Sequence, residues 1–193
     1  MTESSPKKAK AGPNGSGKST ITTNLPIIGD YVNADDIQKE TGCSSLEAAQ
    51  IATATREYMV DNNMDFTFES VLSTPRNYEL MEKAKNNNYK IICVYVTTTD
   101  PEINVKRVEA RVKNGGHSVP PEKIRERYYR AMKLFPKLLY LCDELYVYDN
   151  SCERGSREPE MIISLQYGKI NYKPNEIWSL DDIEKLCNGS YMD

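Results

Sequence analysis

One segment near the amino end constrains the fold more than any other, because it matches the pattern GxxxxGK[ST] at every fixed position. It reads Gly12-Pro13-Asn14-Gly15-Ser16-Gly17-Lys18-Ser19 and is followed by Thr20. Glycines allow consecutive backbone N–H groups to turn inward around phosphate oxygens, and the helix that follows directs its positive end at the same anion. The segment therefore predicts a loop that binds a triphosphate between a strand and a helix.

Two side chains of this loop have predicted chemical roles. Lys18 is expected to reach the β- and γ-phosphates of a nucleotide, and Ser19 is expected to hold a magnesium ion. Residues Gly12 to Thr20 together form the predicted nucleotide site. We therefore expect ATP and Mg²⁺ as cofactors.

The residues before the loop are unusual for a phosphate-binding protein. Such a loop normally follows a central buried strand, yet the segment Pro6-Lys7-Lys8-Ala9-Lys10-Ala11 carries three lysines where Val and Ile are expected. Residues 1–10 therefore form an atypical polar N-terminus. Either the first strand is short and unusual, or the N-terminus has been replaced or truncated.

Strand and helix patterns alternate along the rest of the chain. Helices are predicted over residues 44–62, 75–86, 101–113 and 124–141, the last interrupted at Pro136, and strands over residues 64–74, 90–99 and 143–151. Two short strands around Gly168 and a capped helix over residues 179–186 follow. Alternating units of this kind predict an α/β fold of three layers, with a mostly parallel sheet and helices on both faces. At 193 residues we expect a single P-loop kinase domain, with ligands at the carboxyl ends of the strands.

Phosphoryl transfer requires a positioned acceptor and neutralised charge, so acids and cations near the strand ends are the candidates. The segment DYVNADDI, residues 30–37, predicts a short strand that ends in the acids Asp35 and Asp36, and Asp35 is our candidate for the base that meets an acceptor hydroxyl. An Asp at this place could instead cap the next helix. Glu69 lies at the end of FTFES, the strand-forming part of residues 64–74, and is expected to orient substrate or to contact magnesium through water.

Arginines concentrate in residues 107–130, which we predict to be a lid over the nucleotide. Arg107 and Arg111 lie one helical turn apart, and Arg127 and Arg130 share a face of the following segment. Arg111 and Arg127 are the candidates for catalysis, because an arginine at a transferring phosphate can be worth ~10³ to 10⁵ in rate. Candidates for substrate or lid contacts are Arg56, Arg107, His117 and Arg130.

The composition of the chain argues against two classes of partner, nucleic acids and membranes. The net charge is −3 and the pI is near 5.4, which argues against a surface that tracks a nucleic-acid backbone. No apolar run approaches the ~20 residues that cross a bilayer, and the polar start lacks the apolar stretch of a secretory signal. The five cysteines are scattered and contain no CxxC pair. We expect a cytoplasmic protein with reduced thiols and no nucleic-acid or membrane partner.

The order of motifs resembles the zeta toxin family of P-loop kinases, especially its compact members that contain GGHxVP. The motifs are AGPNGSGKST, VNADDI, TATREYM, FTFESVLST, RVEARVKNGGHSVPPEKIRERYYR and DELYVYDNS. The resemblance implies a kinase that phosphorylates the 3′-hydroxyl of a UDP-N-acetyl amino sugar, such as UDP-N-acetylglucosamine, with an antitoxin as a possible protein partner. It also implies that Lys18 is the phosphate-loop lysine, Asp35 the acceptor-activating acid and Glu69 the acid after the next strand. Lid arginines would be among Arg107, Arg111, Arg127 and Arg130.

Two other functions stay open at this level. The chain could be a nucleotide-binding regulatory or toxin–antitoxin module without efficient turnover. It could also be a kinase for a nucleoside or another metabolite, since likeness of fold constrains chemistry better than it constrains substrate.

Overall fold

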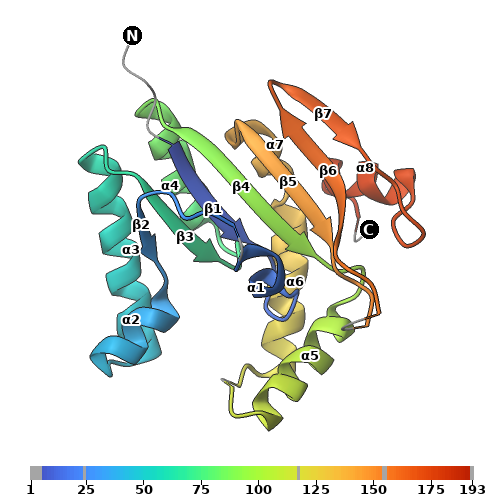
Figure 1. The fold of residues 1–193 in the computed structure, drawn as a ribbon, viewed down its shortest axis with the longest axis horizontal. Helices are drawn as coiled ribbons and strands as arrows, with labels where there is room; N and C mark the ends of the chain where they lie inside the picture. The colour runs from blue at the N-terminus through green and yellow to red at the C-terminus, as the bar shows by residue number, and fades with distance from the viewer. Residues whose placement is uncertain (1–5, 24, 117, 154–155, 192–193) are drawn as a thin grey trace.

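The computed structural model describes residues 6–23, 25–116, 118–153 and 156–191. Its centre is a seven-stranded sheet in the order β2-β3-β1-β4-β5-β6-β7 (Figure 1). The first five of these strands in that order are parallel, whereas β6 and β7 are antiparallel. The strands are β1 (Pro6–Ala11), β2 (Asp30–Val32), β3 (Phe66–Ser70), β4 (Lys90–Thr97), β5 (Glu144–Asp149), β6 (Glu160–Gln166) and β7 (Lys169–Tyr172).

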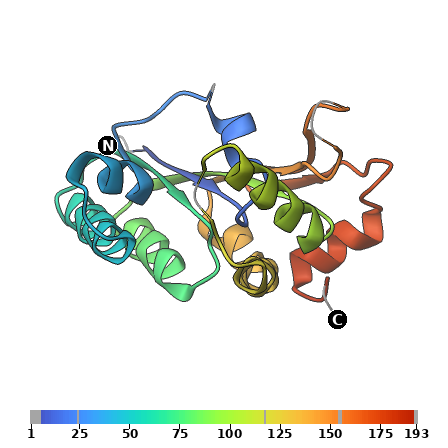
Figure 2. The same ribbon diagram turned by 90° about the horizontal axis from the view of Figure 1, so that it is seen from below.

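Helices lie on both faces of this sheet, which confirms the predicted fold class. Figure 2 shows α3, α4, α7 and α8 along one face, and α1 on the opposite face. The helices are α1 (Lys18–Thr22), α2 (Ala34–Thr41), α3 (Ser45–Asp61), α4 (Pro75–Asn86), α5 (Pro101–Lys113), α6 (Pro121–Leu134), α7 (Pro136–Leu141) and α8 (Leu180–Asn188). None of the helices in the described part of the chain combines the length and apolar character needed to span a bilayer.

The lysine-bearing segment before the loop forms β1, a six-residue strand hydrogen-bonded to β3 on one side and β4 on the other. Its side chains alternate between the faces of the sheet, and Ala9 joins the main hydrophobic core. Lys10 is only 5% exposed; its Nζ donates to the Thr22 carbonyl over 2.8 Å and lies 5.2 Å from the centroid of the Tyr31 ring. A buried lysine is tolerated here because its ammonium hydrogen-bonds the last turn of α1.

Helix α2 is an element that the sequence analysis did not predict. It begins directly after β2, and its N-cap is Asn33, whose side chain accepts a hydrogen bond from the Asp35 backbone N–H over 3.1 Å. Because Asn33 performs the capping, the carboxylate of Asp35 is not needed for it. Asp35 is exposed in the first turn of α2.

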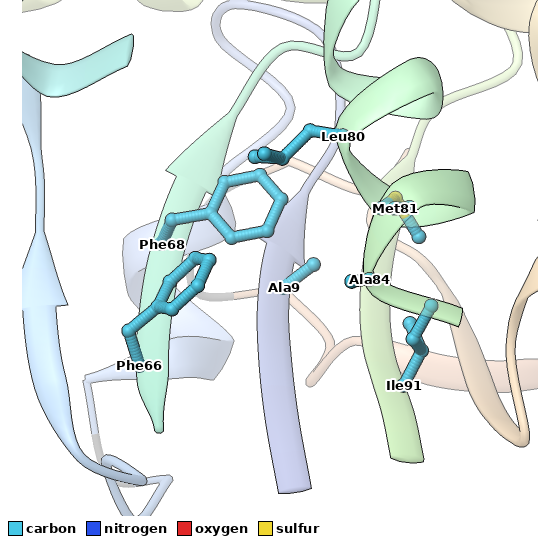
Figure 3. A pocket seen from close by; sticks show the side chains of 7 residues that line it. All are labelled: Ala9, Phe66, Phe68, Leu80, Met81, Ala84 and Ile91. Carbon is cyan, nitrogen blue, oxygen red and sulfur yellow. The ribbon is translucent and has the colours of Figure 1, made fainter. Parts of the chain in front are cut away.

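A small apolar cavity of about 10 Å³ lies between the sheet and α4 (Figure 3). Its lining comes from β1, β3, α4 and β4 and consists of Ala9, Phe66, Phe68, Leu80, Met81, Ala84 and Ile91. Ala9 is the small side chain of β1 on this face, next to Phe68 in the view of Figure 3. The cavity follows from placing alanine in a central strand, where a larger β-branched residue is usual.

We predict that Ala9→Val stabilises the protein by about 0.5 to 1 kcal/mol, because the added methyl groups fill the cavity and valine favours a strand. Urea denaturation followed by circular dichroism measures the free energy of unfolding. A loss of 1 kcal/mol or more would show instead that the site is already full and that valine overpacks it.

Candidate phosphate-binding and catalytic site

The phosphate loop is held at the carboxyl edge of the sheet by close backbone contacts. The Gly12 N–H donates to the Ser70 carbonyl at the end of β3 over 3.2 Å. A Cβ atom at Gly12 would lie 2.1 Å from the Val96 carbonyl oxygen of β4. The loop therefore needs glycine at this position, because any side chain would push it away from the sheet.

Asn150, directly after β5, fixes the loop from the other side. Its Nδ2 donates to the Ser16 carbonyl over 2.7 Å, and its backbone N–H donates to the Thr97 carbonyl over 2.9 Å. A Cβ atom at Gly17, where φ is 86°, would lie 2.1 Å from that Nδ2. The loop is thus clamped between the ends of β3 and β5.

Lys18 is turned toward the loop itself. Its Nζ donates to the carbonyls of Gly12 over 3.0 Å and Pro13 over 3.3 Å, and lies 3.9 Å from the Glu69 carboxylate. Burial lowers the pKa of Lys18; Glu69 raises this pKa, Arg111 lowers it and Asp35 raises it. Three residues predicted from other motifs therefore influence the charge of Lys18 at the phosphate loop.

Glu69 is oriented by a tyrosine that the motif analysis did not single out. The Tyr31 hydroxyl donates to Glu69 Oε2 over 3.0 Å, and Tyr31 belongs to β2, beside β3 in the sheet. Burial, together with the negative charge of Glu69, raises the pKa of Tyr31, so this hydroxyl keeps its proton at neutral pH. One carboxylate oxygen of Glu69 thus faces Tyr31 and the other faces Lys18.

Two of the predicted lid arginines approach the loop. Arg127 of α6 donates from Nη1 to Asn14 Oδ1 over 3.3 Å. Arg111, near the end of α5, is exposed and close enough to Lys18 to affect its pKa. These are the two arginines that the sequence analysis selected for catalysis.

The other described lid candidates make contacts outside the phosphate loop. Arg107 of α5 donates to the Asn150 carbonyl over 2.7 Å and to the Cys152 carbonyl over 2.5 Å, so its guanidinium ties α5 to the segment after β5. Arg130 is exposed on α6 and forms an ion pair with Glu126 over 3.2 Å. His117 lies outside the described residues.

Arg56 lies inside the protein, between α3 and the end of β3. It is 8% exposed, and its Nε donates to the Ala52 carbonyl of its own helix over 2.8 Å. Nη1 donates to Asn77 Oδ1 over 3.3 Å, and the guanidinium carbon lies 5.2 Å from the centroid of the Phe68 ring. The structure thus separates Arg56 from the lid arginines.

The loop also fits the phosphates and the magnesium ion that its sequence implies. Ser16 Oγ is buried without a hydrogen-bond partner among the described residues, and the Ser19 side chain is exposed at the start of α1 beside Thr20. The described residues contain no cluster of three or more His, Cys, Asp or Glu that could hold a metal by themselves.

Some residues of the site were not found from the sequence. Asn150 and Tyr31 contact the loop and Glu69, and Asn77 contacts Arg56. The signal available for Asn150 was its place directly after a predicted strand, at the edge where ligands bind. Nothing local distinguishes Tyr31 or Asn77 from other tyrosines and asparagines of the chain.

Fold and site together define a P-loop α/β protein. The chain belongs to the zeta toxin family, because the sequence model described as zeta toxin matches residues 27–154, more than half of the chain. The matched segment begins after the phosphate loop and contains Asp35, Glu69 and the lid arginines. This confirms the resemblance drawn from the order of motifs.

A relative from Haemophilus influenzae, a protein without an assigned function, is 29% identical over 123 residues, which cover 61% of this chain and 88% of the relative. The fold resembles solved structures of AvrRxo1-ORF1:AvrRxo1-ORF2, one with sulphate ions (TM-score 0.68, 15% identity) and one with ATP (TM-score 0.68, 14% identity). In both, the match covers 95% of this chain and 63% of the other. The PezAT chromosomal toxin–antitoxin system of Streptococcus pneumoniae gives a TM-score of 0.55 at 16% identity, covering 98% of this chain and 85% of the other. These similarities establish the fold.

We predict that Gly17→Ala costs more stability than Gly42→Ala. Both glycines have positive φ, 86° and 69°, but no atom lies within 4 Å of a Cβ at Gly42, whereas Asn150 occupies that place at Gly17. Gly42→Ala should cost about 1 to 2 kcal/mol from backbone strain alone. Gly17→Ala should cost about 1 to 3 kcal/mol more, because the hydrogen bond to Ser16 is broken.

Urea denaturation of the two variants and of Gly17→Ala/Asn150→Ala measures these differences. The double variant should lose less stability than the sum of the two single losses, because the asparagine that would clash with the added methyl group is gone. Equal losses for Gly17→Ala and Gly42→Ala would contradict the clamp.

The lowered pKa of Lys18 has a consequence for stability that depends on pH. The unfolded chain binds this proton more tightly than the folded protein, so wild-type stability relative to Lys18→Met should increase as pH rises through the folded pKa toward 10.5. Denaturation of both proteins at a series of pH values checks the sign. If the stability difference between the wild type and Lys18→Met falls as pH rises, the effect of Glu69 and Asp35 on the Lys18 pKa outweighs that of burial.

Proposed function

We propose that the chain is an ATP-dependent kinase that transfers a phosphoryl group to the hydroxyl of a small molecule, with a UDP-N-acetyl amino sugar as the acceptor. Membership of the zeta toxin family and a neighbour of the same fold solved with ATP support the kinase class. The acceptor rests on the family resemblance. Residues 1–193 are taken as one kinase domain, with residues 107–130 as its lid.

One observation carries this proposal: the Lys18 ammonium lies 3.9 Å from the Glu69 carboxylate at the phosphate loop, and Glu69, Asp35 and Arg111 all influence its pKa. A glycine turn that does not bind phosphate does not require two acids and two cations at its edge. Phosphoryl transfer needs such an arrangement, with cations for the transferring group and an acid for the acceptor.

The proposed mechanism assigns one task to each residue. Asp35 accepts the proton of the acceptor hydroxyl, whose oxygen bonds to the γ-phosphorus as the bond between that phosphorus and the β–γ bridging oxygen breaks. Lys18 and Arg127 stabilise the negative charge that develops on the phosphate oxygens, and Arg111 closes the site from α5. Glu69, held by Tyr31, orients the acceptor.

Magnesium would be held by the Ser19 hydroxyl, with the phosphates and water completing its coordination, and would neutralise charge between the β- and γ-phosphates. Residues Gly12 to Thr20 would bind the rest of the triphosphate through backbone N–H groups. We place the protein in the cytoplasm, where ATP and magnesium are available.

A second candidate is a nucleotide-binding module of a toxin–antitoxin pair without efficient turnover. Its support is the likeness to two solved structures. AvrRxo1-ORF1:AvrRxo1-ORF2 contains two components, and PezAT is described as a chromosomal toxin–antitoxin system. Tight ATP binding without phosphorylation of any hydroxyl acceptor, together with a stable complex with a cognate antitoxin, would favour this alternative.

Asp35→Asn should lower kcat by about 10² to 10⁴ while nucleotide affinity changes little, because the variant loses the base but keeps the loop. Formation of ADP from ATP and magnesium is measured with and without UDP-N-acetylglucosamine. Asp36→Asn is the matched control: Asp36 is the neighbouring acid and pairs with Lys39 over 3.7 Å on the surface of α2. Release of ADP that does not depend on an acceptor, or equal effects of the two variants, would refute the assignment.

A further inference from the structure

Lys10 is a buried cation at the centre of the sheet that the proposed mechanism does not use. It is only 5% exposed, and its strand β1 lies between β3 and β4 (Figure 1), where its register partners are Glu69 and Val94. In the part of the chain that the structure describes, no carboxylate lies within 4.0 Å of its ammonium. A buried charge without a counter-ion is costly, and an apolar side chain of similar size would avoid this cost. Stability alone therefore does not account for a lysine here.

Two contacts fix the position of the Lys10 ammonium. Nζ donates to the carbonyl of Thr22, the last residue of α1, over 2.8 Å. The same atom lies over the ring of Tyr31, 5.2 Å from its centroid. A cation is attracted to the face of an aromatic ring, and the attraction is stronger where water is excluded. The ammonium is thus anchored to a helix on one side and holds a half-buried ring on the other.

The Tyr31 side chain carries this contact to Glu69. Lys10 is the register partner of Glu69, and Tyr31 is the register partner of Thr67, two residues before Glu69 in β3. Because side chains two residues apart in a strand share a face, all of these side chains lie on the face that α1 covers. The Tyr31 hydroxyl donates to Glu69 Oε2 over 3.0 Å. Tyr31 therefore reaches from β2 toward both neighbouring strands, with its ring at Lys10 and its hydroxyl at Glu69.

The place of Tyr31 in the sheet explains why its ring needs a second contact. Strand β2 is at the edge of the sheet, so no further strand limits the ring from its outer side. A single hydrogen bond at the hydroxyl fixes one point of a side chain that turns about two bonds. The contact with Lys10 fixes a second point. Glu69, whose other carboxylate oxygen lies 3.9 Å from Lys18 Nζ, is then held from both sides.

We propose that Lys10 is a positioning residue of the reaction site: its ammonium, anchored on Thr22, holds the Tyr31 ring so that the Tyr31 hydroxyl keeps Glu69 in place beside Lys18. The inference rests on the proposed function in one respect, namely that Glu69 orients the acceptor. It gives the lysine in the central strand a task that valine or isoleucine could not perform.

The first test is kinetic and uses Lys10→Met, which keeps the stem of the side chain but removes its charge and its N–H donors. Formation of ADP is measured with magnesium while ATP and UDP-N-acetylglucosamine are varied in turn. For the acceptor, kcat/KM should fall about 10-fold, as for the loss of one hydrogen bond, while KM for ATP changes little. A rise in KM for ATP with no change for the acceptor would show that Lys10 acts on α1 alone and would overturn the inference.

A double-mutant cycle tests whether Lys10 acts through Tyr31. Tyr31→Phe keeps the ring and removes the hydroxyl that contacts Glu69, so it should also lower kcat/KM for the acceptor about 10-fold. In the Tyr31→Phe background, Lys10→Met should cause a further loss of about twofold or less, because no hydroxyl remains to be aimed. Independent effects that multiply to about 100-fold would overturn the inference.

Lys90→Met is the matched control. Lys90 begins the neighbouring strand β4, at the end of the sheet away from the loop, and pairs with Glu144 over 2.5 Å. This variant should keep the wild-type kcat/KM. Urea denaturation then separates positioning from folding: Lys10→Met should leave the midpoint unchanged or raise it, because it removes a buried charge that lacks a counter-ion. A lower midpoint, with equal losses of activity in the wild-type and Tyr31→Phe backgrounds, would make Lys10 structural and refute the inference.

Carbon-13 NMR of the glutamate side-chain carboxyl groups tests the same chain of contacts without turnover. The Glu69 resonance is assigned with Glu69→Gln. Lys10→Met and Tyr31→Phe should shift this resonance in the same direction, and the double variant should shift it no further than Tyr31→Phe does. An unchanged Glu69 resonance in Lys10→Met would refute the inference even if the kinase is confirmed. Conversely, the expected shifts in a protein that phosphorylates no acceptor would refute the kinase and leave the placement of Glu69 by Lys10 standing.

Discussion

The placement of the phosphate loop is the constraint on which the rest of the structure depends. The loop is attached to β3 through the hydrogen bond from Gly12 to Ser70, and to the segment after β5 through Asn150 and Ser16. Both attachments lie at the carboxyl edge of the parallel strands, where the chain must leave the sheet. A Cβ atom at Gly12 would collide with the Val96 carbonyl of β4, and one at Gly17 would collide with Asn150, so the loop needs glycine at both positions to stay in place. Lys18 and Glu69 take their places relative to it.

Two cationic side chains near this edge have lowered pKa values. The pKa of Lys18 is lowered by burial despite Glu69, and the pKa of Arg56 is lowered by burial and by Arg76. Perturbed pKa values of this kind cluster at functional sites. Lys18 lies at the phosphate loop, and Arg56 lies between α3 and the first turn of α4.

The arginines of residues 107–130 are of two kinds. Arg107 joins α5 to the carbonyls after β5 and so belongs to the framework, whereas Arg127 reaches the side chain of Asn14 in the loop. The two kinds cannot be told apart by spacing along a helix, since spacing gives a shared face and no partner. In the lid that we propose, Arg127 is therefore the arginine that contacts the phosphate loop, while Arg107 holds α5 to the segment after β5.

The sequence by itself determined the phosphate loop, the alternation that gives the α/β fold, and the family, because these depend on local patterns and on their order. It also placed Asp35 and Glu69 at strand ends, where parallel topology brings them together. Only the tertiary structure decided that the lysine-bearing segment is a central strand, because the carbonyl that satisfies Lys10 belongs to Thr22 of α1. It likewise decided where the Arg56 side chain points, because its guanidinium donates a hydrogen bond to Asn77 in another helix. Long side chains find partners far away in sequence, and no local pattern encodes which partner will be near.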